Sequence, residues 1–256
     1  MQMEKTISKA VILGASGGIG RQLARELAQR TDQLVLVGRD EAKLTQLQED
    51  LSGVRAKLSC RVLDLLDAAA VDDFALQLEA DLVINCCGLA DFGSALSLSE
   101  ADEKALWQVN YQAPIRLMKQ VVERNRKINL VQLSSLAALC PHPYLAAYSA
   151  SKAALQTHCL ALQEELRLKG SGVTVCLYIL GPVRTAIFPP ELQDALGGSQ
   201  LQMSPEIAAQ RIVGLLQQGR SYAIVGKRYR LLAWLMKLLP QRWIIRLIGA
   251  YLRKGL

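Results

Sequence analysis

A tyrosine and a lysine in the middle of the chain have the types and the spacing needed to move a proton. Tyr148 and Lys152 lie four residues apart in the stretch YSASK, so on a helix their side chains share one face. A tyrosine hydroxyl has an ordinary pKa of about 10, and a nearby ammonium group stabilises its phenolate form. The pair therefore predicts a general acid or base for a carbonyl or alcohol oxygen, with Lys152 lowering the pKa of Tyr148.

A serine upstream of this pair is placed to assist the same reaction. Ser135 follows the apolar stretch INLVQL, residues 128–133. Its hydroxyl can donate a hydrogen bond to the carbonyl oxygen as negative charge develops there. The pattern G-x-S-x-G does not occur around Ser135, which argues against a hydrolase.

A glycine-rich turn near the N-terminus predicts a dinucleotide site. The apolar run of residues 10–13 leads into GASGGIG, and apolar side chains then recur at helical spacing over residues 19–27. A pyrophosphate needs a tight turn without obstructing side chains, and the N–H groups at a helix N-terminus supply positive potential. We assign the following residues to cofactor binding: Gly14, Ser16, Gly17, Gly18, Ile19 and Gly20. The alternative is a turn with a structural role alone.

The end of the second apolar run bears on which dinucleotide is bound. The stretch LVLVGRD places Gly38 and Arg39 where the adenosine ribose is expected. An acidic residue there would repel a 2′-phosphate, whereas glycine does not and Arg39 can pair with it. We therefore expect NADP(H) to be preferred, with NAD(H) as the alternative. The competing interpretation is that Arg39 is a solvated residue at the start of the next helix.

A third position is assigned to the adenine. We expect a strand at RVLDL, and Asp64 after it is placed to accept a hydrogen bond from the adenine amino group, with Leu65 beside it. The alternative is that Asp64 only stabilises a turn or caps a helix.

These residues need a scaffold of alternating strands and helices. Apart from RVLDL, short apolar runs occur at residues 10–13, 34–37, 82–85, 128–133, 173–180 and 222–225. Nearly unbroken hydrophobicity is typical of parallel strands buried on both faces, and the intervening segments are long enough for helical crossovers. The sequence predicts an α/β fold, a Rossmann-like doubly wound parallel sheet in a single domain, with a C-terminal helical extension.

Composition narrows the possible functions. The chain has 256 residues and a formal charge of +7, but residues 227–256 hold eight basic and no acidic residues, which leaves 22 basic and 23 acidic residues before them. A nucleic-acid-binding protein should carry its basic residues across a docking face of the fold, so we expect no nucleic-acid partner. The six cysteines show no CxxC spacing, and we expect no metal site. The short apolar run before Gly14 and the lack of a charge-free run near 18 residues predict a cytoplasmic protein.

In the order and spacing of these motifs, the sequence resembles the short-chain dehydrogenase/reductase family over roughly residues 8–226. The cofactor glycines of that family are matched by Gly14, Gly18 and Gly20. Its NNAG element is matched by Asn85 and Gly88 in the altered form NCCG. Its catalytic residues are matched by Asn110, Ser135, Tyr148 and Lys152. Its PGxVxT loop is matched by LGPVRT, with Leu180 in place of the first proline.

The resemblance implies hydride transfer between NADP(H) and a carbonyl or alcohol, with Tyr148 as the acid or base. It also implies that Lys152 holds the nicotinamide ribose and that the protein is a homodimer or homotetramer. The residues that it places beside the nicotinamide are Gly181, Val183 and Thr185. The alternative function is a non-catalytic NADP(H)-binding sensor or scaffold with the same fold.

Residues 186–203 form the segment that faces the substrate in that family. They include Phe188, Pro189, Pro190 and Leu192, and they have no cluster of Arg or Lys that would hold a phosphate or carboxylate. This favours a hydrophobic carbonyl or alcohol substrate, such as a lipid, a fatty-acyl compound or a steroid-like molecule. The alternative is that these side chains only pack the loop on the core.

The last 30 residues differ from the rest in their charge and their amphipathic pattern. We therefore divide the chain into a main domain, residues 1–226, and a basic helical tail, residues 227–256. Apolar residues recur at helical spacing before and after Pro240, which predicts two short amphipathic helices. Basic residues together with Trp234 and Trp243 are typical of a segment that lies in an anionic membrane interface. The sequence thus predicts peripheral membrane contact, and the alternative is a hydrophobic oligomer interface.

Overall fold

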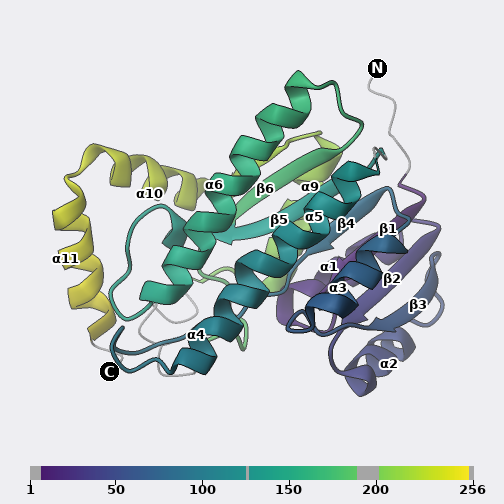
Figure 1. Cartoon of the computed structure of the whole chain (residues 1–256), viewed down its shortest axis with the longest axis horizontal. Helices are drawn as coiled ribbons and strands as arrows, with labels where there is room; N and C mark the ends of the chain where they lie inside the picture. The colour runs from purple at the N-terminus through teal and green to yellow at the C-terminus, as the bar shows by residue number, and fades with distance from the viewer. Residues whose placement is uncertain (1–6, 125–126, 189–201, 254–256) are drawn as a thin grey trace.

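The computed structural model describes residues 7–124, 127–188 and 202–253. Seven strands form one wholly parallel sheet in the order β3-β2-β1-β4-β5-β6-β7 (Figure 1). The strands are β1 (Lys9–Leu13), β2 (Gln33–Gly38), β3 (Lys57–Val62), β4 (Leu82–Asn85), β5 (Asn129–Ser135), β6 (Thr174–Leu180) and β7 (Tyr222–Val225). This confirms the predicted doubly wound α/β fold.

The third strand differs from the expectation. The sequence suggests RVLDL, but β3 spans Lys57–Val62 and ends before Asp64. None of its residues is fully buried, because β3 is an edge strand. An edge strand needs no unbroken apolar run, so hydrophobicity alone does not find its start.

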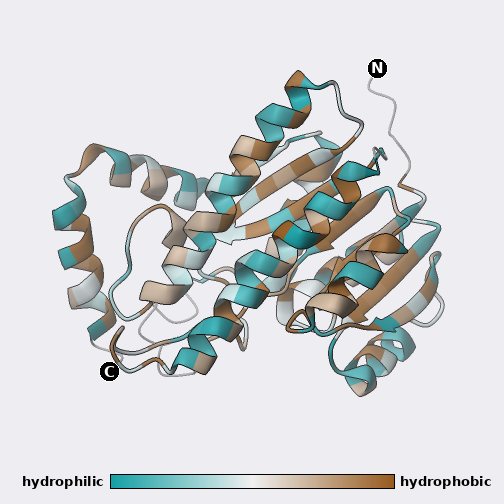
Figure 2. Ribbon diagram, in the orientation of Figure 1, coloured by the Kyte–Doolittle hydropathy of each residue, from teal (hydrophilic) through white to brown (hydrophobic). Residues whose placement is uncertain are grey.

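Helices cover both faces of the sheet (Figure 1). One hydrophobic cluster joins the sheet to α1 (Gly18–Ala28), α2 (Glu41–Asp50) and α9 (Pro205–Gln217). The other joins it to α3 (Ala68–Leu76), α5 (Ala113–Glu123) and α6 (Ala146–Leu168). Figure 2 shows strands that are hydrophobic over most of their length, as burial on both faces requires.

The strand order reverses at β1, which lies between β2 and β4. The chain leaves β1 and β4 in opposite directions there, which opens a crevice at their carboxyl ends. The glycine-rich turn follows β1, and Asn85 is the last residue of β4. The predicted cofactor residues therefore gather at the edge of the sheet where ligands bind in this class of fold.

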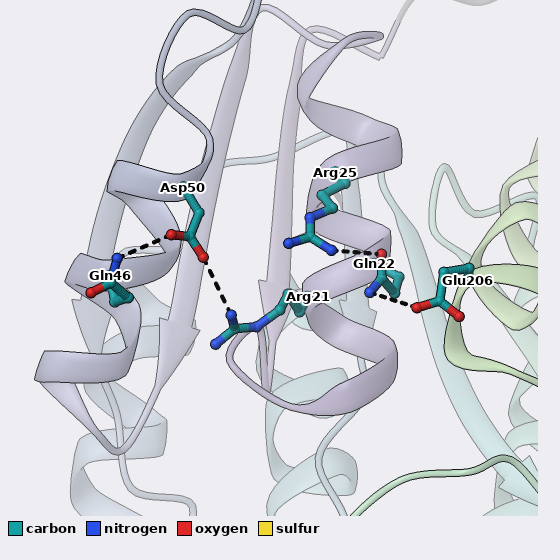
Figure 3. A network of polar contacts seen from close by, with 6 residues as sticks. All are labelled: Arg21, Gln22, Arg25, Gln46, Asp50 and Glu206. Atoms are coloured by element: carbon teal, nitrogen blue, oxygen red, sulfur yellow. Dashed lines mark hydrogen bonds and ion pairs between the residues drawn. The ribbon is translucent and has the colours of Figure 1, made fainter.

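Polar contacts fix the position of α1 beside its neighbours (Figure 3). Arg21 pairs with Asp50 at the end of α2 at 3.3 Å. Gln22 donates to Glu206 in the first turn of α9 at 3.1 Å. These side chains are partly exposed, so each contact contributes little to stability.

Two helices follow β7. They are α10 (Lys227–Leu238) and α11 (Gln241–Leu252), and they are separated at Pro240 as expected. They arch outward from the sheet at the left of Figure 1. Tyr229 and Ala233 of α10 are buried in the same cluster as β6, and Leu252 of α11 packs with Leu145 just before α6. None of the helices in the described ranges is long and apolar enough to cross a bilayer.

Candidate active site

Tyr148 and Lys152 lie in the first two turns of α6, and both side chains are buried. The Lys152 Nζ lies 6.0 Å from the centroid of the Tyr148 ring. It donates a hydrogen bond to the carbonyl oxygen of Leu133 in β5 at 3.1 Å. The helical spacing thus places the two groups on one face of α6, beside the carboxyl end of β5.

Burial decides the ionisation of this pair. Desolvation raises the pKa of Tyr148 above its ordinary value, and a hydrogen bond with Ser135 opposes this only in part. Desolvation also lowers the pKa of Lys152 to about 8. The expected lowering of the Tyr148 pKa by Lys152 is therefore not observed, because the apolar surroundings disfavour both charges. The phenol is protonated at neutral pH, which suits it to give a proton to a carbonyl oxygen.

Ser135 brings a second hydroxyl to the same point. It is the last residue of β5, and its Oγ accepts a hydrogen bond from the backbone N–H of Ala137 at 3.2 Å. Its hydroxyl also interacts with Tyr148. Two hydroxyl groups from different elements thus converge, and this arrangement can bind one carbonyl oxygen from two sides.

Asn110 lies apart from the cluster of Ser135, Tyr148 and Lys152. It lies in a single π-helical turn, Gln108–Gln112, between α4 (Glu100–Trp107) and α5. Its side chain accepts from the Leu89 N–H and donates to the Leu89 carbonyl, both at 2.8 Å, and also donates to Ser151 Oγ at 3.0 Å. These contacts tie the segment after β4 to α6. In this structure Asn110 positions the site, and a direct catalytic role stays a prediction.

The glycine-rich turn has the geometry that a pyrophosphate needs. Gly14 has φ +77° and its N–H donates to Val37 at the end of β2 at 2.8 Å. The first residue before α1, Gly17, provides no side-chain cap, so backbone N–H groups at this end are available to an anion. A Cβ on Gly20 would lie 2.1 Å from the Gly14 carbonyl oxygen. These observations fit a dinucleotide cofactor.

Replacing Gly20 by alanine tests this fit. The added methyl group forces the turn open, so we expect NADPH affinity to fall at least tenfold and the thermal midpoint to drop. Gly214 in α9 is the matched control, because nothing lies within 4 Å of a Cβ there; Gly214→Ala should stabilise by about 0.5–1 kcal/mol. Fluorescence titration with NADPH and thermal unfolding measure both effects. Identical titration curves for Gly20→Ala and the wild type would contradict the assignment.

The residues assigned to the adenosine half lie around the end of β2. Arg39 is exposed and precedes Asp40, whose side chain accepts from the Lys43 N–H at 3.1 Å and caps α2. Arg39 thus lies just before the helix cap and is solvated, and its pairing with a 2′-phosphate stays a prediction. Asp64 is also exposed, and its carboxylate accepts from the Leu66 N–H at 2.9 Å, which is a turn contact. The adenine role of Asp64 and Leu65 stays a prediction.

Asn85 and Gly88 shape the segment that follows β4. Asn85 is buried, donates to Gln132 at 3.0 Å and accepts from the Cys87 N–H at 3.0 Å. A Cβ on Gly88 would lie 3.5 Å from both Asn110 Oδ1 and Lys152 Nζ. Gly88 thus lies beside both of these side chains.

The loop after β6 is held from two sides. Val183 forms a backbone bridge with Met203, and the Thr185 methyl group lies against Gly18 at the start of α1. On the other side, the Tyr229 ring of α10 covers Gly181 so closely that a Cβ there would lie 2.5 Å from it. The Tyr229 hydroxyl donates to the carbonyl oxygen of Pro182 at 3.2 Å. The sequence patterns give no role to Tyr229, because it falls in a segment read for its amphipathic character alone.

A cavity of about 640 Å³ joins these parts. Its polar lining includes Ser135, Tyr148, Lys152 and His142, whose Nδ1 lies 2.7 Å from the Cys140 carbonyl oxygen. Most of the remaining lining is apolar. Phe188 packs edge-on against the Tyr148 ring at 5.6 Å between centroids; Pro189, Pro190 and Leu192, which the sequence also assigns to the substrate side, lie outside the described residues.

The far wall of this cavity comes from α10 and α11, which sequence reasoning missed. These helices and the link between them contribute eleven of its lining residues: Arg228, Tyr229, Leu232, Leu235, Met236, Leu239, Ile244, Leu247, Ile248, Tyr251 and Leu252. Amphipathic spacing signals that the segment buries one face. It does not say what that face covers. Among the described residues, no group of three or more His, Cys, Asp or Glu is placed to hold a metal ion.

Comparison with known proteins agrees with this geometry. A family model described as short chain dehydrogenase matches residues 8–195. Dehydrogenase/reductase SDR family member 7B of Xenopus laevis is 31% identical over 179 residues, covering 64% of this chain and 55% of that protein. The very-long-chain 3-oxoacyl-CoA reductase of Meyerozyma guilliermondii is 34% identical over 192 residues, covering 67% of this chain and 55% of that protein. The chain thus spans about half the length of these two relatives.

Solved structures share the fold over nearly the whole chain. A short-chain dehydrogenase/reductase from Burkholderia phymatum in complex with NAD has a TM-score of 0.80 at 22% identity, covering 92% of this chain and 95% of that one. A short-chain dehydrogenase from Sphingobium yanoikuyae in complex with NADPH has a TM-score of 0.76 at 24% identity, covering 91% and 97%. The family match, the glycine-rich turn and the Ser135, Tyr148 and Lys152 cluster lead to one conclusion. The chain belongs to the short-chain dehydrogenase/reductase family of NAD(P)-dependent oxidoreductases.

Proposed function

We propose that the protein transfers a hydride between NADP(H) and a hydrophobic carbonyl or alcohol. The observation that carries this proposal is the convergence of the Ser135 and Tyr148 hydroxyls, with Lys152 beside them, in a mainly apolar cavity of about 640 Å³. A cavity of this size and lining suits a ligand that is large and mostly apolar and has one polar reacting group.

The cofactor, when bound, supplies or accepts the hydride. The glycine-rich turn would hold its pyrophosphate, Arg39 its 2′-phosphate and Lys152 its nicotinamide ribose. In the reducing direction, Ser135 donates a hydrogen bond to the carbonyl oxygen and Tyr148 gives that oxygen a proton as negative charge develops on it. In the oxidising direction, Tyr148 accepts the proton of the alcohol.

The cofactor preference is tested by Gly38→Asp. A Cβ at Gly38 would lie 3.4 Å from Leu44 and 3.5 Å from Ser16 Oγ, which are ordinary contacts, so the backbone there accepts a side chain at its first carbon. The new carboxylate would repel a 2′-phosphate but not a 2′-hydroxyl. We expect the Kd for NADPH to rise at least tenfold, about 1.4 kcal/mol, while the Kd for NADH changes little. Parallel titrations measure both constants, and NADH binding serves as the folding control. Equal weakening for the two cofactors would argue against this placement of the ribose.

The substrate class is supported by the apolar cavity and by the relative named as a very-long-chain 3-oxoacyl-CoA reductase. The direct experiment follows NADPH consumption with three carbonyl probes: a long-chain 3-oxoacyl thioester, a ketosteroid and cyclohexanone. We expect turnover with at least one of the two large probes and a much lower kcat/KM for cyclohexanone. A preference for cyclohexanone would overturn the assignment of a hydrophobic substrate.

A non-catalytic sensor or scaffold is the second candidate. Such a protein has no need for Ser135, Tyr148 and Lys152 in one cavity, and their convergence favours the enzyme. Tight NADPH binding without turnover of any probe would favour the sensor.

The assembly into a homodimer or homotetramer and the cytoplasmic location also stay proposals. Sedimentation of the full chain would test the assembly, and cell fractionation would test the location.

A further inference from the structure

The two C-terminal helices expose an unusual share of the hydrophobic surface. Nine of the seventeen exposed large hydrophobic side chains among the described residues belong to α10, α11 or the link between them. They are Leu231, Leu232, Trp234, Leu235, Leu238, Leu239, Trp243, Leu247 and Tyr251. We call this set the C-terminal apolar face. A cluster of this kind marks a surface that contacts a partner or a membrane.

The charge around this face favours a membrane as the partner. Residues 227–256 contain eight Lys or Arg and no Asp or Glu. The seven basic residues that the structure describes there are all exposed: Lys227, Arg228, Arg230, Lys237, Arg242, Arg246 and Arg253. Apolar side chains mixed with basic ones, with exposed Trp234 and Trp243 among them, suit an anionic bilayer surface. A second copy of the same face would instead bring like charges together.

The C-terminal apolar face consists of two rows. The outer row is exposed and does not line the catalytic cavity; it consists of Leu231, Trp234, Leu238 and Trp243. The second row is both exposed and part of the cavity lining: Leu232, Leu235, Leu239, Leu247 and Tyr251. These five side chains therefore border both the cavity and the surface of the protein.

The body of the protein holds this arrangement in place. Tyr229 and Ala233 anchor α10 in the core, and the Tyr229 ring covers Gly181 in the loop after β6. On α11, Gly249 contacts Pro143 in the segment before α6, where a Cβ would lie 3.2 Å from the Pro143 Cγ. Each helix is thus fixed to a segment that borders the catalytic residues.

We propose that the C-terminal apolar face rests on an anionic lipid bilayer and that hydrophobic substrate passes from the bilayer through this face into the catalytic cavity. The outer row contacts the acyl region and the basic residues contact the headgroups. The second row forms the mouth of the cavity. A hydrophobic substrate then reaches Tyr148 without crossing water. The route for substrate rests on the proposed function, whereas membrane contact does not.

Membrane contact is tested with the full chain and vesicles of phosphatidylcholine, with and without about 30% phosphatidylglycerol, whose anionic headgroups attract basic segments. We expect sedimentation with the anionic vesicles at low salt, release at high salt, and little binding to the neutral ones. The double variant Trp234→Ser/Trp243→Ser should lower binding at least tenfold. Leu168→Ser is the matched control, since Leu168 is exposed to 71% at the end of α6, outside the apolar face; it should bind like the wild type.

The substrate route is tested by comparing a long-chain ketone carried in the anionic vesicles with a water-soluble ketone, each with NADPH. We expect the tryptophan double variant to lose at least tenfold in rate on the vesicle-borne ketone and to keep its rate on the soluble one. Equal losses on both would overturn the route. Tyr148→Phe should still sediment with vesicles, so a failure of the proposed reaction remains distinguishable from a failure of membrane contact.

A different outcome would assign the face to another partner. If the full chain ignores anionic vesicles, and the tryptophan variant instead converts an oligomer to monomers in sedimentation velocity, the face is a subunit interface and the membrane proposal is wrong. The wild-type vesicle measurement by itself decides whether the face contacts a membrane, even if the variant fails to fold.

Discussion

Replacing Tyr148 by phenylalanine is expected to lower kcat by about 10²–10⁴ while leaving the Kd for NADPH nearly unchanged. The ring remains and keeps its packing against Phe188, but the only proton that it can give is removed. Burial holds the phenol in its protonated form, since it raises the pKa of Tyr148. The experiment measures NADPH consumption with the best carbonyl probe, alongside a fluorescence titration of NADPH.

Tyr222→Phe is the control for this change. Tyr222 is exposed on β7 and does not line the catalytic cavity, so its loss should alter neither rate nor binding. If Tyr148→Phe keeps its rate within a factor of three of the wild type, proton transfer by this residue is excluded and the proposed mechanism fails.

Replacing Lys152 by methionine is expected to change activity and stability in opposite directions. Activity should fall by at least a hundredfold, because the group beside Tyr148 that is expected to hold the nicotinamide ribose is removed. Stability at pH 7 should rise by about 2 kcal/mol. Burial lowers the Lys152 pKa from 10.5 to about 8, which corresponds to a cost of roughly 3 kcal/mol for the charged form in the folded state. Loss of the hydrogen bond to Leu133 offsets about 1 kcal/mol of that gain.

The sign of the pH dependence follows from the direction of this shift. Below a pH of about 8 the folded and unfolded chains both carry the ammonium group, and only the folded chain bears the cost of burying it. Between about 8 and 10.5 the folded chain has lost the proton and the unfolded chain keeps it, so wild-type stability rises with pH from this source. The advantage of Lys152→Met should therefore shrink across this range. Urea unfolding of both proteins at pH 7 and pH 9.5 measures it, and a variant less stable than the wild type at pH 7 would contradict the argument.

The sequence by itself determined the parts of the protein that depend on local spacing. Tyr148 and Lys152 share a face because a helix repeats every 3.6 residues. The turn around Gly14 and Gly20 can be predicted from the sequence because only glycine tolerates such a close approach of backbone segments. The buried strands can be predicted from the sequence because both of their faces must be apolar. These features need no knowledge of how distant segments meet.

Long-range packing decided the rest. The pKa of Tyr148 depends on how deeply it is buried, which its spacing from Lys152 does not reveal. The edge strand β3 has no buried face to mark it in the sequence. The polar contacts of Asn110 join Leu89 and Ser151, which are far from it along the chain. The periodicity of residues 227–252 predicts an apolar face. Only the fold shows that residues of this segment line the catalytic cavity, because that depends on long-range contacts such as the packing of Tyr229 on Gly181.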